Sequence, residues 1–533
     1  MIKQILKEKI YLAVNLSYPK VEIVDFGVEE TAEKFGDYST NVAMILAKKA
    51  GEKPEKIAEK IIEVIRQSDD QVIESATLAG NGFINFKIQI PYLNEKIPEI
   101  LEKGEAYGSS LLGQKLRVNI EFISANPTGP LTLGNGRNAY AGDCLANVYK
   151  FYGAKVDREY YFNDRGVQVT ALGHSVLKDA EAVYKGAYID EIAPRITTQT
   201  PIEAGMQAAD ILFKEYIKKT IATMGIEFDQ FFSERSLIDK GTVFTILERL
   251  KELKLTYEKD GALWLKTSDY GDDKDRVLVK KDGDYTYFVS DIAYAYDKIR
   301  RGYNLCFIFL GADHHGFVGR LQAAVEILRK EEKWIGELKV PICQLVRLVS
   351  GGKEVRMSKR SGTYVLLDEL LQEVGPDVTR FFFLDRSLDT QMDFDLDLAK
   401  EKSQKNPVFY VQYAYARIHS ILEKSEIRNP KHETNSKKQN LNLLKEPEEL
   451  ALIKELMKLP ELVLEIIKDS QVQKLSFYAR SLAEKFHHFY EKCPVLLAEN
   501  SETAAARIQL LKATQIVLKN TLDLMGITTP EKM

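Results

Sequence analysis

Residues 117–164 read RVNIEFISANPTGPLTLGNGRNAYAGDCLANVYKFYGAKVDREYYFND. Val118, Ile120 and Phe122 alternate with polar residues at the start, and the closing KVDREYYF alternates in the same way, so both ends predict strands. A glycine-rich turn and a run of helical character lie between them. This order implies a right-handed parallel crossover unit, which binds ligands at the carboxyl ends of its strands. The segment therefore predicts an α/β core.

The sequence before this segment predicts a small separate domain. Pro54 opens a stripe of isoleucines at helical spacing, and residues 83–90 nearly alternate like a strand. The glycine- and serine-rich stretch at 102–114 has no period and marks a boundary. We therefore expect an α+β domain over residues 1–106.

The sequence after the segment predicts a long core domain and a helical end. A chain of 533 residues exceeds the roughly 250 to 300 residues at which one hydrophobic core stops growing. We expect the core over residues 115–400, with a mostly helical insertion at about 165–260. Its second half is expected to supply strands near 284–290, 304–310 and 344–349. Apolar residues recur at helical spacing further on, which predicts an all-α bundle over 406–533.

Composition limits the possible functions. The formal net charge of -4 argues against unspecific wrapping of nucleic acid, so any RNA contact must be a local basic surface. The four cysteines are scattered and form no C-x-x-C pair, so we expect reduced thiols, a cytoplasmic location and no protein-bound zinc. The first residues contain no sustained apolar run, so neither a signal peptide nor a membrane partner is expected.

The turn ANPTGPLTLGNGR, residues 125–137, is the first candidate for binding chemistry. Its three glycines, at the point where a predicted strand gives way to a helix, would let the backbone approach a phosphate or a planar ligand. Many tight turns have the same glycine spacing and bind nothing. On spacing alone, an anion site and a plain turn are equally acceptable interpretations.

The segment GGKEVRMSKRSGTYV, residues 351–365, is the second candidate. Lys353, Arg356, Lys359 and Arg360 place four cations close together beyond a predicted strand, which suits a polyphosphate whose charge grows during transfer. A solvated basic loop is the alternative interpretation. The presence of both segments in one chain favours phosphate chemistry.

These segments resemble known signatures. Residues 125–135 resemble the first signature of class I aminoacyl-tRNA synthetases in its arginyl form, A-N-P-T-G-P-L-H-x-G-H, and residues 356–360 resemble the second, K-M-S-K-S. The S-A-N-P-T-G-P lead is specific to the arginyl branch. GDYSTNVAMILAKK and GNGFINF are similar to that family's N-terminal tRNA-binding domain, FLGADHHG to its adenosine-side loop, and NPVFYVQYAYARI to the start of its anticodon-binding domain.

The resemblance implies both a fold and a reaction. The fold is an α/β Rossmann-like class I synthetase catalytic domain, with an N-terminal α+β tRNA-binding domain and a C-terminal all-α anticodon-binding bundle. The reaction is the ATP-dependent ligation of L-arginine to tRNA(Arg) through an arginyl-adenylate. The resemblance further implies that tRNA is needed for the first step, and we expect a monomer.

The resemblance also assigns residues to roles. Those implied in catalysis are Lys359, Thr132, Asn135 and Arg356. Those implied in ATP binding are Pro127, Gly129, Leu133, Gly134, Gly136, Asp313, His315, Met357 and Ser358. Those implied in arginine binding are Glu121, Asn126, Tyr287, Asp291 and His314. Those implied in tRNA binding are Phe409, Tyr410, Tyr413 and Arg417.

The residue types suit these roles, although each has an alternative. A guanidinium is bound best by carboxylates that accept two hydrogen bonds, which suits Glu121 and Asp291. Glu121 lies among apolar residues, so even a structural role would require a cation beside it. Asp291 follows a predicted strand and could be only a helix N-cap. The four aromatic and basic residues assigned to tRNA could stack on bases or pack in the bundle.

Metal and histidine chemistry is expected to be limited. The adjacent His314 and His315 have no third ligand at suitable spacing, so we expect no zinc site. ATP should bring Mg²⁺, held largely by its own phosphates and by water. His487 and His488 lie in a helical stripe and are expected to be structural or surface residues.

Two other functions are alternatives to this one. A synthetase for another amino acid, such as cysteine, would need a zinc-type set of cysteines that this sequence lacks. The second is a catalytically inactive synthetase-like RNA-binding protein, because Thr132 and Asn135 replace both signature histidines. The retention of Lys359 and of the guanidinium-reading set favours an enzyme. We expect Thr132 and Asn135 to donate hydrogen bonds to phosphates, Gly134 and Gly136 to admit the nucleotide, and Arg137, Lys353, Arg356 and Lys359 to supply the missing charge.

Overall fold

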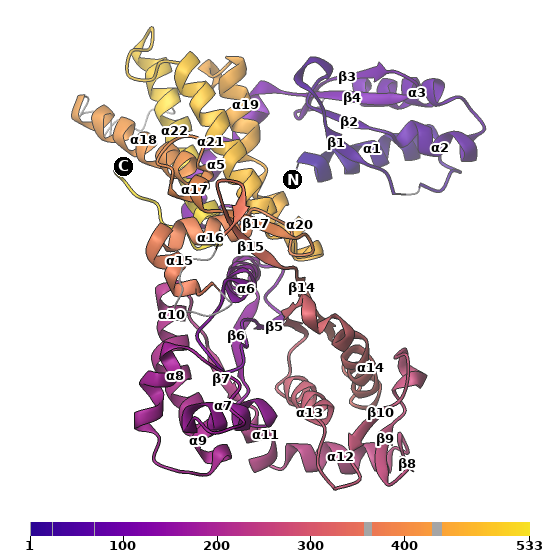
Figure 1. Cartoon of the computed structure of the whole chain (residues 1–533). Helices are drawn as coiled ribbons and strands as arrows, with labels where there is room; N and C mark the ends of the chain where they lie inside the picture. Colours follow the sequence, from indigo (N-terminus) through magenta and orange to yellow (C-terminus); the bar gives the residue numbers. More distant parts are fainter. Residues whose placement is uncertain (1, 24, 69, 356–364, 429–439) are drawn as a thin grey trace.

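The computed structural model describes residues 2–23, 25–68, 70–355, 365–428 and 440–533. A helical bundle lies between the small N-terminal unit and the larger α/β core (Figure 1). In the described part of the chain, no helix is long and apolar enough to cross a membrane.

The N-terminal unit is an antiparallel sheet covered by helices. Its strands lie in the order β1-β2-β4-β3 and have the bounds Val28–Glu30, Tyr38–Thr40, Ile73–Ala79 and Phe83–Ile88 for β1 to β4. Its helices are α1 (Ile2–Ser17), α2 (Val42–Ala50) and α3 (Pro54–Gln67). The helix predicted after Pro54 is α3, and its isoleucine stripe is buried as expected.

Two further helices join this unit to the bundle. They are α4 (Ile90–Asn94) and α5 (Lys96–Lys103). Asn94 donates a hydrogen bond from Nδ2 to the carbonyl of Leu441 at 2.8 Å, and Asn520 donates to the carbonyl of Gly104 at 3.1 Å. In Figure 1, α5 lies among the helices of the bundle. The last part of residues 1–106 therefore packs with the C-terminal domain.

The core is built on a five-stranded, fully parallel sheet. Its order is β13-β11-β5-β6-β7. The bounds are Glu337–Lys339 (β13), Leu305–Ile308 (β11), Arg117–Glu121 (β5), Lys155–Phe162 (β6) and Gln230–Ser233 (β7). The chain adds β6 and β7 on one side of β5 and then returns to add β11 and β13 on the other. Ligands of such sheets bind at the carboxyl ends of the strands where this reversal occurs, here β5 and β11.

Helices and a small sheet surround the parallel sheet. The elements are α6 (Leu133–Phe151), α7 (Val167–Leu177), α8 (Ala187–Ile192), α9 (Pro201–Ile211), a π-helix (Leu212–Ile217), α10 (Lys218–Thr223), α11 (Arg235–Asp239), α12 (Thr242–Glu252), β8 (Thr256–Lys259), β9 (Ala262–Leu265), β10 (Arg276–Val279), α13 (Tyr287–Arg300) and α14 (His315–Glu331). The helix predicted between β5 and β6 is α6, and it places the first signature segment at the carboxyl end of β5.

Two predictions for the core need correction. The stretch at about 165–260 is mostly helical, as expected, but it also contains β7, which belongs to the parallel sheet and is not part of an insertion. Residues 284–290 were expected to form a strand, but Tyr287 begins α13. Phe288, Val289, Ile292 and Ala293 are buried at helical spacing, and this period becomes visible only when the window extends beyond residue 290.

A third sheet connects the core to the bundle. It consists of β16 (Lys353–Glu354), β15 (Val346–Ser350) and β17 (Met392–Asp395), in that order, and a parallel pair, β12 (Leu310–Gly311) with β14 (Ile342–Cys343), precedes it. The accompanying helices are α15 (Leu367–Val374), α16 (Pro376–Leu384) and α17 (Leu396–Lys400). The strands predicted near 304–310 and 344–349 correspond to β11 and β15.

The C-terminal bundle is helical, as predicted. Its helices are α18 (Pro407–Arg428), α19 (Pro447–Leu456), α20 (Leu459–Asp469), α21 (Lys474–Lys492) and α22 (Ser501–Met525). Arg380, buried in α16, fastens this bundle to the core. Its guanidinium lies 2.6 Å from Asp143 on α6 and donates to the carbonyls of Met224 at 3.0 Å and Met525 at 3.2 Å. A buried charge needs such partners, because an unpaired one would be strongly destabilising.

Candidate active site

The first signature segment begins with strained backbone. Ile123 and Ser124, directly after β5, have φ angles of 65° and 39°, which are unfavourable for side chains and most of all for a β-branched one. Asn138 on α6 stabilises this turn, because its Oδ1 accepts from the Ile123 N–H at 2.7 Å and its Nδ2 donates to the Phe309 carbonyl at 3.1 Å. The strain therefore lies where β5 and β11 end, as expected for a functional turn.

The two residues that replace the signature histidines form a helix cap. Thr132 is the N-cap of α6, and both its N–H and its hydroxyl donate to Asn135 Oδ1, at 2.8 and 3.0 Å. The Thr132 hydroxyl is thus engaged inside the cap, which differs from its predicted role as a phosphate donor. Within the described ranges, the Asn135 Nδ2 group has no hydrogen-bond partner. It lies beside the exposed Gly134 at a helix N-terminus, which is a favourable place for an anion.

Two neighbouring residues have roles that differ from those predicted. Gly136 is buried, and a Cβ there would lie 2.8 Å from Leu367 and 3.0 Å from Phe383. The missing side chain therefore lets α6 pack closely against α15 and α16. Arg137 is fully buried and donates to the carbonyls of Gln344 and Ser387, so its charge does not reach phosphates at the surface.

The remaining loop residues are held by the insertion. Tyr188 on α8 donates its hydroxyl to the carbonyl of Thr128 at 2.9 Å, and a Cβ on Gly129 would lie 3.4 Å from that hydroxyl oxygen. Pro127 and Leu133 are buried, whereas Asn126 is exposed at the surface of the loop. Asn126 is therefore the polar side chain of this turn that can reach a ligand.

The second signature lies outside the described residues, including Arg356, Met357, Ser358, Lys359 and Arg360. Both of its flanks are described. On the near side, Val355 donates its N–H to the Leu348 carbonyl at 2.9 Å in the β15–β16 hairpin. On the far side, Leu133 donates to the Val365 carbonyl at 3.1 Å and Leu367 to the Leu131 carbonyl at 2.9 Å. These bonds bring the chain that follows the second signature against the first.

Three carboxyl groups meet near the end of the sheet. Glu121 ends β5, Glu234 directly follows β7, and Asp291 lies in the interior of α13, which excludes the N-cap alternative for it. Burial and the charge of Glu234 raise the pKa of Asp291 to about 8. Burial also raises the pKa of Glu234 to about 7. Raised carboxyl pKa values of this kind cluster at functional sites.

These three acids differ in their present partners. Lys298 lies 3.1 Å from Glu121 Oε2 and 2.8 Å from Glu159, so the cation that a structural role for Glu121 requires is present. Glu234 and Asp291 have no ion pair within 4 Å among the described residues, and Glu234 Oε2 is buried there without a hydrogen-bond partner. Glu234 and Asp291 are therefore the acids of this site that lack a close cation among the described residues.

Tyr287 lies on the same side of α13 as Asp291, because residues four apart on a helix are neighbours. Its hydroxyl accepts from the N–H of Val167 at 3.0 Å, and its side chain is 52% exposed. Tyr287 therefore lies one helical turn before Asp291 on α13, with its ring partly open to solvent.

Sequence reasoning missed Glu234. The signal that could have revealed it is its place after QFFS, a short strand whose neighbours in the chain are helical. Asp164, which follows β6 in the same way, accepts from the Ser233 hydroxyl and from the Arg235 N–H at 2.9 Å. Asp164 thus fixes the turn that carries Glu234.

The predicted adenosine-side residues lie after β12. Asp313 and His314 form an exposed turn in which His314 Nε2 is 3.4 Å from Asp313 Oδ2, and His315 begins α14. In the described part of the chain, no group of histidine, cysteine and acidic side chains could hold a metal ion. The turn faces solvent and carries the polar groups that were predicted to meet ATP.

The predicted tRNA-binding residues form a ladder of rings on α18. Phe409 and Tyr413 stack with centroids 6.0 Å apart, and the Arg417 guanidinium lies 5.1 Å from the Tyr413 ring. His487 on α21 lies 4.8 Å from the Tyr410 ring and is buried, which lowers its pKa to about 4. The four predicted residues are half-buried, so they both pack against α21 and leave ring edges accessible.

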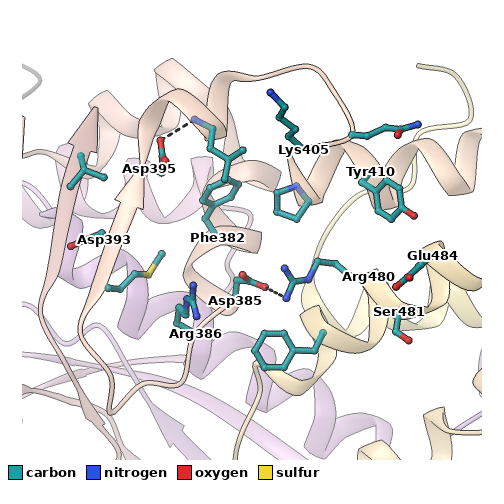
Figure 2. Close-up of a pocket in the computed structure, with 16 residues that line it drawn as sticks. Phe382, Asp385, Arg386, Asp393, Asp395, Lys405, Tyr410, Arg480, Ser481 and Glu484 are labelled. Atoms are coloured by element: carbon teal, nitrogen blue, oxygen red, sulfur yellow. Dashed lines mark hydrogen bonds and ion pairs between the residues drawn. The ribbon is translucent and has the colours of Figure 1, made fainter. Parts of the chain in front are cut away.

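Tyr410 also borders a groove of about 910 Å³ between the bundle and the third sheet (Figure 2). The groove lies between α16, β15 and β17 on one side and α18 and α21 on the other. Asp385 and Arg480 form an ion pair of 3.3 Å across it. The groove is lined by the acids Asp385, Asp393, Asp395 and Glu484 and by the cations Arg386, Lys405 and Arg480. Its lining is therefore of mixed charge.

The chain resembles known proteins along its whole length. Three domain families match it: the Arginyl tRNA synthetase N terminal domain at residues 1–88, the tRNA synthetases class I (R) catalytic domain at 203–382, and the DALR anticodon binding domain at 411–533. The arginine–tRNA ligase of Aquifex aeolicus is 39% identical and that of Shouchella clausii 42% identical. The first alignment covers 100% of both chains, and the second covers 93% of this chain and 92% of the relative.

Solved structures agree with this result. A structure described as a putative arginyl-tRNA synthetase from Campylobacter jejuni is 32% identical, has a TM-score of 0.73, and matches over 83% of this chain and 99% of its own. The arginyl-tRNA synthetase of Thermus thermophilus shares the fold over both whole chains, with a TM-score of 0.79 and 21% identity. The predicted fold class is thereby confirmed. With family domains along its length and ligase relatives near 40% identity, the chain belongs to the arginyl-tRNA synthetase family and ligates arginine to its tRNA.

Proposed function

We propose that this ligase binds the guanidinium of arginine between Asp291 and Glu234, at the carboxyl ends of β5 and β7. The observation that carries the proposal is a pair of neighbouring buried acids with raised pKa values, neither of which has an ion-pair partner within 4 Å among the described residues. A guanidinium supplies donors in a planar fork and can bind both acids at once. Binding would return both groups to their ionised forms and give them a cation in direct contact.

The other arginine-binding residues surround this pair. Tyr287 lies one helical turn before Asp291 on α13. Glu121 adds negative charge from β5 while Lys298 holds it in place. Asn126, exposed in the first signature turn, suits the main-chain amino group of the substrate, because an amide oxygen accepts from an ammonium. His314 lies further along the same edge of the sheet. Its role is the one that the family resemblance implies.

The first chemical step is the attack of the arginine carboxylate on the α-phosphorus of ATP, with pyrophosphate as the leaving group. Positioning and charge stabilisation supply most of the catalysis, so no side-chain nucleophile is required. The N-terminus of α6, with Gly134 and the Asn135 Nδ2 group, offers donors to the phosphates. Lys359 and Arg356, assigned by the family resemblance, add positive charge. Mg²⁺ bound to ATP neutralises phosphate charge and takes most of its ligands from ATP and water.

The Thr132–Asn135 cap replaces the function of the histidine pair in this proposal. The cap fixes the first turn of α6 and leaves the Asn135 amide as a donor. A helix N-terminus stabilises negative charge without a titratable group. The enzyme can therefore form the adenylate without either histidine.

The second step transfers the arginyl group to a ribose hydroxyl of the terminal adenosine of tRNA(Arg). Phe409, Tyr410, Tyr413 and Arg417 offer rings and a guanidinium for contact with anticodon bases, which is supported by their half-buried positions. We further propose that the enzyme acts as a cytoplasmic monomer.

An exchange assay tests the proposed site. Purified native protein is incubated with ATP, Mg²⁺ and labelled pyrophosphate, with arginine or with citrulline, and with or without tRNA(Arg). Citrulline has nearly the shape of arginine but carries no positive charge, so it probes the two acids directly. We expect exchange with arginine and tRNA and none with citrulline. Equal exchange with citrulline would contradict the acidic site, and tRNA binding without any arginyl-tRNA would contradict the reaction.

A further inference from the structure

Arg137 is a buried cation that the proposed reaction does not use. Its side chain is fully buried in α6, and burial lowers its pKa. It has no carboxylate partner within 4 Å in the described ranges, and its Nε has no hydrogen-bond partner there. Asp389 acts on it only from beyond ion-pair distance. A buried charge without a counterion in direct contact is unfavourable, and an apolar side chain of similar volume would often be more stable. The guanidinium therefore needs an explanation beyond packing.

The two carbonyl groups that Arg137 binds belong to chain segments that flank one another. Gln344, whose carbonyl accepts at 3.1 Å, comes just before β15, and Ser387 lies in the link between α16 and β17. The N–H of Gln344 also donates to the carbonyl of Leu388 at 2.8 Å. The strands β15 and β17 then run parallel. The guanidinium thus joins α6 to the start of both strands.

One of these strands leads to the second signature. The chain passes from Gln344 through β15 and β16 to Val355, directly before the basic segment. After that segment, Val365 and Leu367 bond to Leu133 and Leu131, close to the N-terminus of α6. Residues 131–137 therefore contact the chain on both sides of the second signature. Arg137 binds the segment before it, and the main chain of Leu131 and Leu133 binds the segment after it.

The same link also contacts the helical bundle. The Ser387 hydroxyl donates to Gln471 Oε1 at 2.9 Å, and Asp385 accepts from the Ser476 hydroxyl at 3.0 Å and pairs with Arg480 across the groove of Figure 2. Arg137 therefore lies where α6, the approach to the second signature and the bundle meet.

We propose that Arg137 is a positioning residue for adenylate formation, which holds residues 344–355, the described approach to the second signature, in register with the N-terminus of α6. The inference rests on the proposed function, in which both elements act on the phosphates of ATP. A guanidinium is suited to the task because its fork binds two carbonyls in a fixed geometry, which a lysine cannot reproduce. Misplacing a catalytic element by about 1 Å is enough to slow a reaction severely.

The test compares Arg137→Lys and Arg137→Met with the native enzyme. The matched control is Arg380→Lys, because Arg380 is also a buried arginine that donates to main-chain carbonyls, but those of Met224, Gly225 and Met525, away from both signatures. Active-site titration counts the folded enzyme, and pyrophosphate exchange then gives kcat and KM. We expect both Arg137 variants to lose about tenfold or more in kcat, with the KM for arginine and the Kd for tRNA within about twofold of native. The control should unfold at a lower temperature and keep its kcat.

A second measurement covers the case in which Arg137→Met does not fold. Hydrogen–deuterium exchange of residues 344–355 should be faster in Arg137→Lys than in the native protein. A native kcat per active site in Arg137→Lys, or unchanged exchange of that segment, would overturn the inference. An equal loss of kcat in Arg380→Lys would show only a general structural effect and would also overturn it. Inactivity of the native protein itself would instead contradict the proposed function.

Discussion

Glu234 raises the pKa of Asp291, although one follows a strand at the edge of the parallel sheet and the other lies within α13. Neither carboxyl group has an ion-pair partner within 4 Å in the part of the chain that the structure describes. The nearby cations Arg320 and Arg165 lower the pKa of Asp291 and Glu234 respectively, but burial outweighs them. The two acids therefore hold protons more readily than ordinary carboxylates do.

This relationship predicts how arginine binding depends on pH. With pKa values of about 8 for Asp291 and about 7 for Glu234, both free groups are protonated at about pH 6. The guanidinium stays charged and binds the ionised acids, so binding releases protons. The KM for arginine should therefore fall as the pH rises, by up to about tenfold per pH unit for each titrating group, and level off above about pH 8. Initial rates at saturating ATP, Mg²⁺ and tRNA measure this profile.

Replacing Asp291 checks the assignment. Asp291→Asn should cost about 2 to 4 kcal/mol in the arginine step, because a charge-assisted contact is lost, and the KM profile should lose its change near pH 8. ATP binding should stay close to native. A flat profile already present in the native enzyme would contradict the proton release.

Glu234→Gln tests the acid that the sequence did not reveal. We expect the free-energy cost in the arginine step to be similar to that of Asp291→Asn. The control is Glu227→Gln, which changes an exposed glutamate shortly before β7 and should behave as native. Glu234 also affects stability. Its folded-state pKa lies above its unfolded value, so its stabilising contribution is present at low pH and is lost as the pH rises through about 7.

Glu234→Gln should accordingly unfold at a higher temperature than native at about pH 8, by a few degrees, and this gain should shrink at about pH 5. Thermal unfolding at the two pH values measures the difference. An unfolding temperature below native at both pH values would mean that the carboxyl group of Glu234 stabilises the fold through a contact that glutamine cannot make.

The cap on α6 gives a third prediction. Thr132→Ala with Asn135→Ala should slow adenylate formation at least about tenfold, because the helix N-terminus loses both its cap and the free amide donor. The single change Thr132→Ala should cost about 1 kcal/mol in stability, as the loss of an N-cap typically does. Restoring two histidines need not raise the rate. A normal exchange rate in the double variant would show that the cap serves folding alone.

Lys359→Ala addresses the basic segment. Its ammonium should matter chiefly when charge develops on the phosphates, so adenylate formation should slow while arginine binding stays nearly intact. Single-turnover rates together with equilibrium arginine binding separate the two effects. Normal turnover with weakened arginine binding would contradict this role and would mean that Lys359 acts on arginine and not on ATP.

Arg417→Ala tests the ring ladder on α18. We expect a higher KM for tRNA, by about tenfold, with little change in KM for ATP or arginine, since stacking on a base is worth roughly 1 to 3 kcal/mol. This variant is a cleaner test than deleting residues 406–533, because the bundle also supplies the Met525 carbonyl to Arg380 and packs against α5. Lys424→Ala, an exposed residue further along α18, is the control. Equal effects of the two variants would contradict a specific contact.

The sequence predicted the arrangement of domains well and the details of the site less well. The strand, turn and helix of the first signature follow from local alternation and period, and they were found where expected. Residues 284–290 were misassigned because a short alternating run cannot be told from the first turn of an amphipathic helix. That error also suggested a cap role for Asp291, which the helix excludes.

Other features depend on contacts between distant parts of the chain. Nothing local in the sequence shows that Gly136 packs against Leu367 and Phe383, or that Arg137 is buried against Gln344 and Ser387. Both residues directly follow the first signature, so proximity to the motif suggested contact with the nucleotide. Glu234 was missed for the opposite reason, because its strand is short and its pairing with β6 is visible only in three dimensions.

The hydrogen bond from Arg380 to the carbonyl of Met525 has a consequence for biosynthesis. Arg380 is buried where α6, α16 and the end of α22 meet, and one of its partners comes from the last helix of the chain. During translation, α6 and α16 leave the ribosome well before α22 is made, so the ion pair of Arg380 with Asp143 can form early, whereas the bond to the Met525 carbonyl has to wait for α22. Domains usually fold as units in order from the N-terminus as they are synthesised. The junction between the core and the bundle of this enzyme is therefore completed late in synthesis, when α22 packs against a core that is already formed.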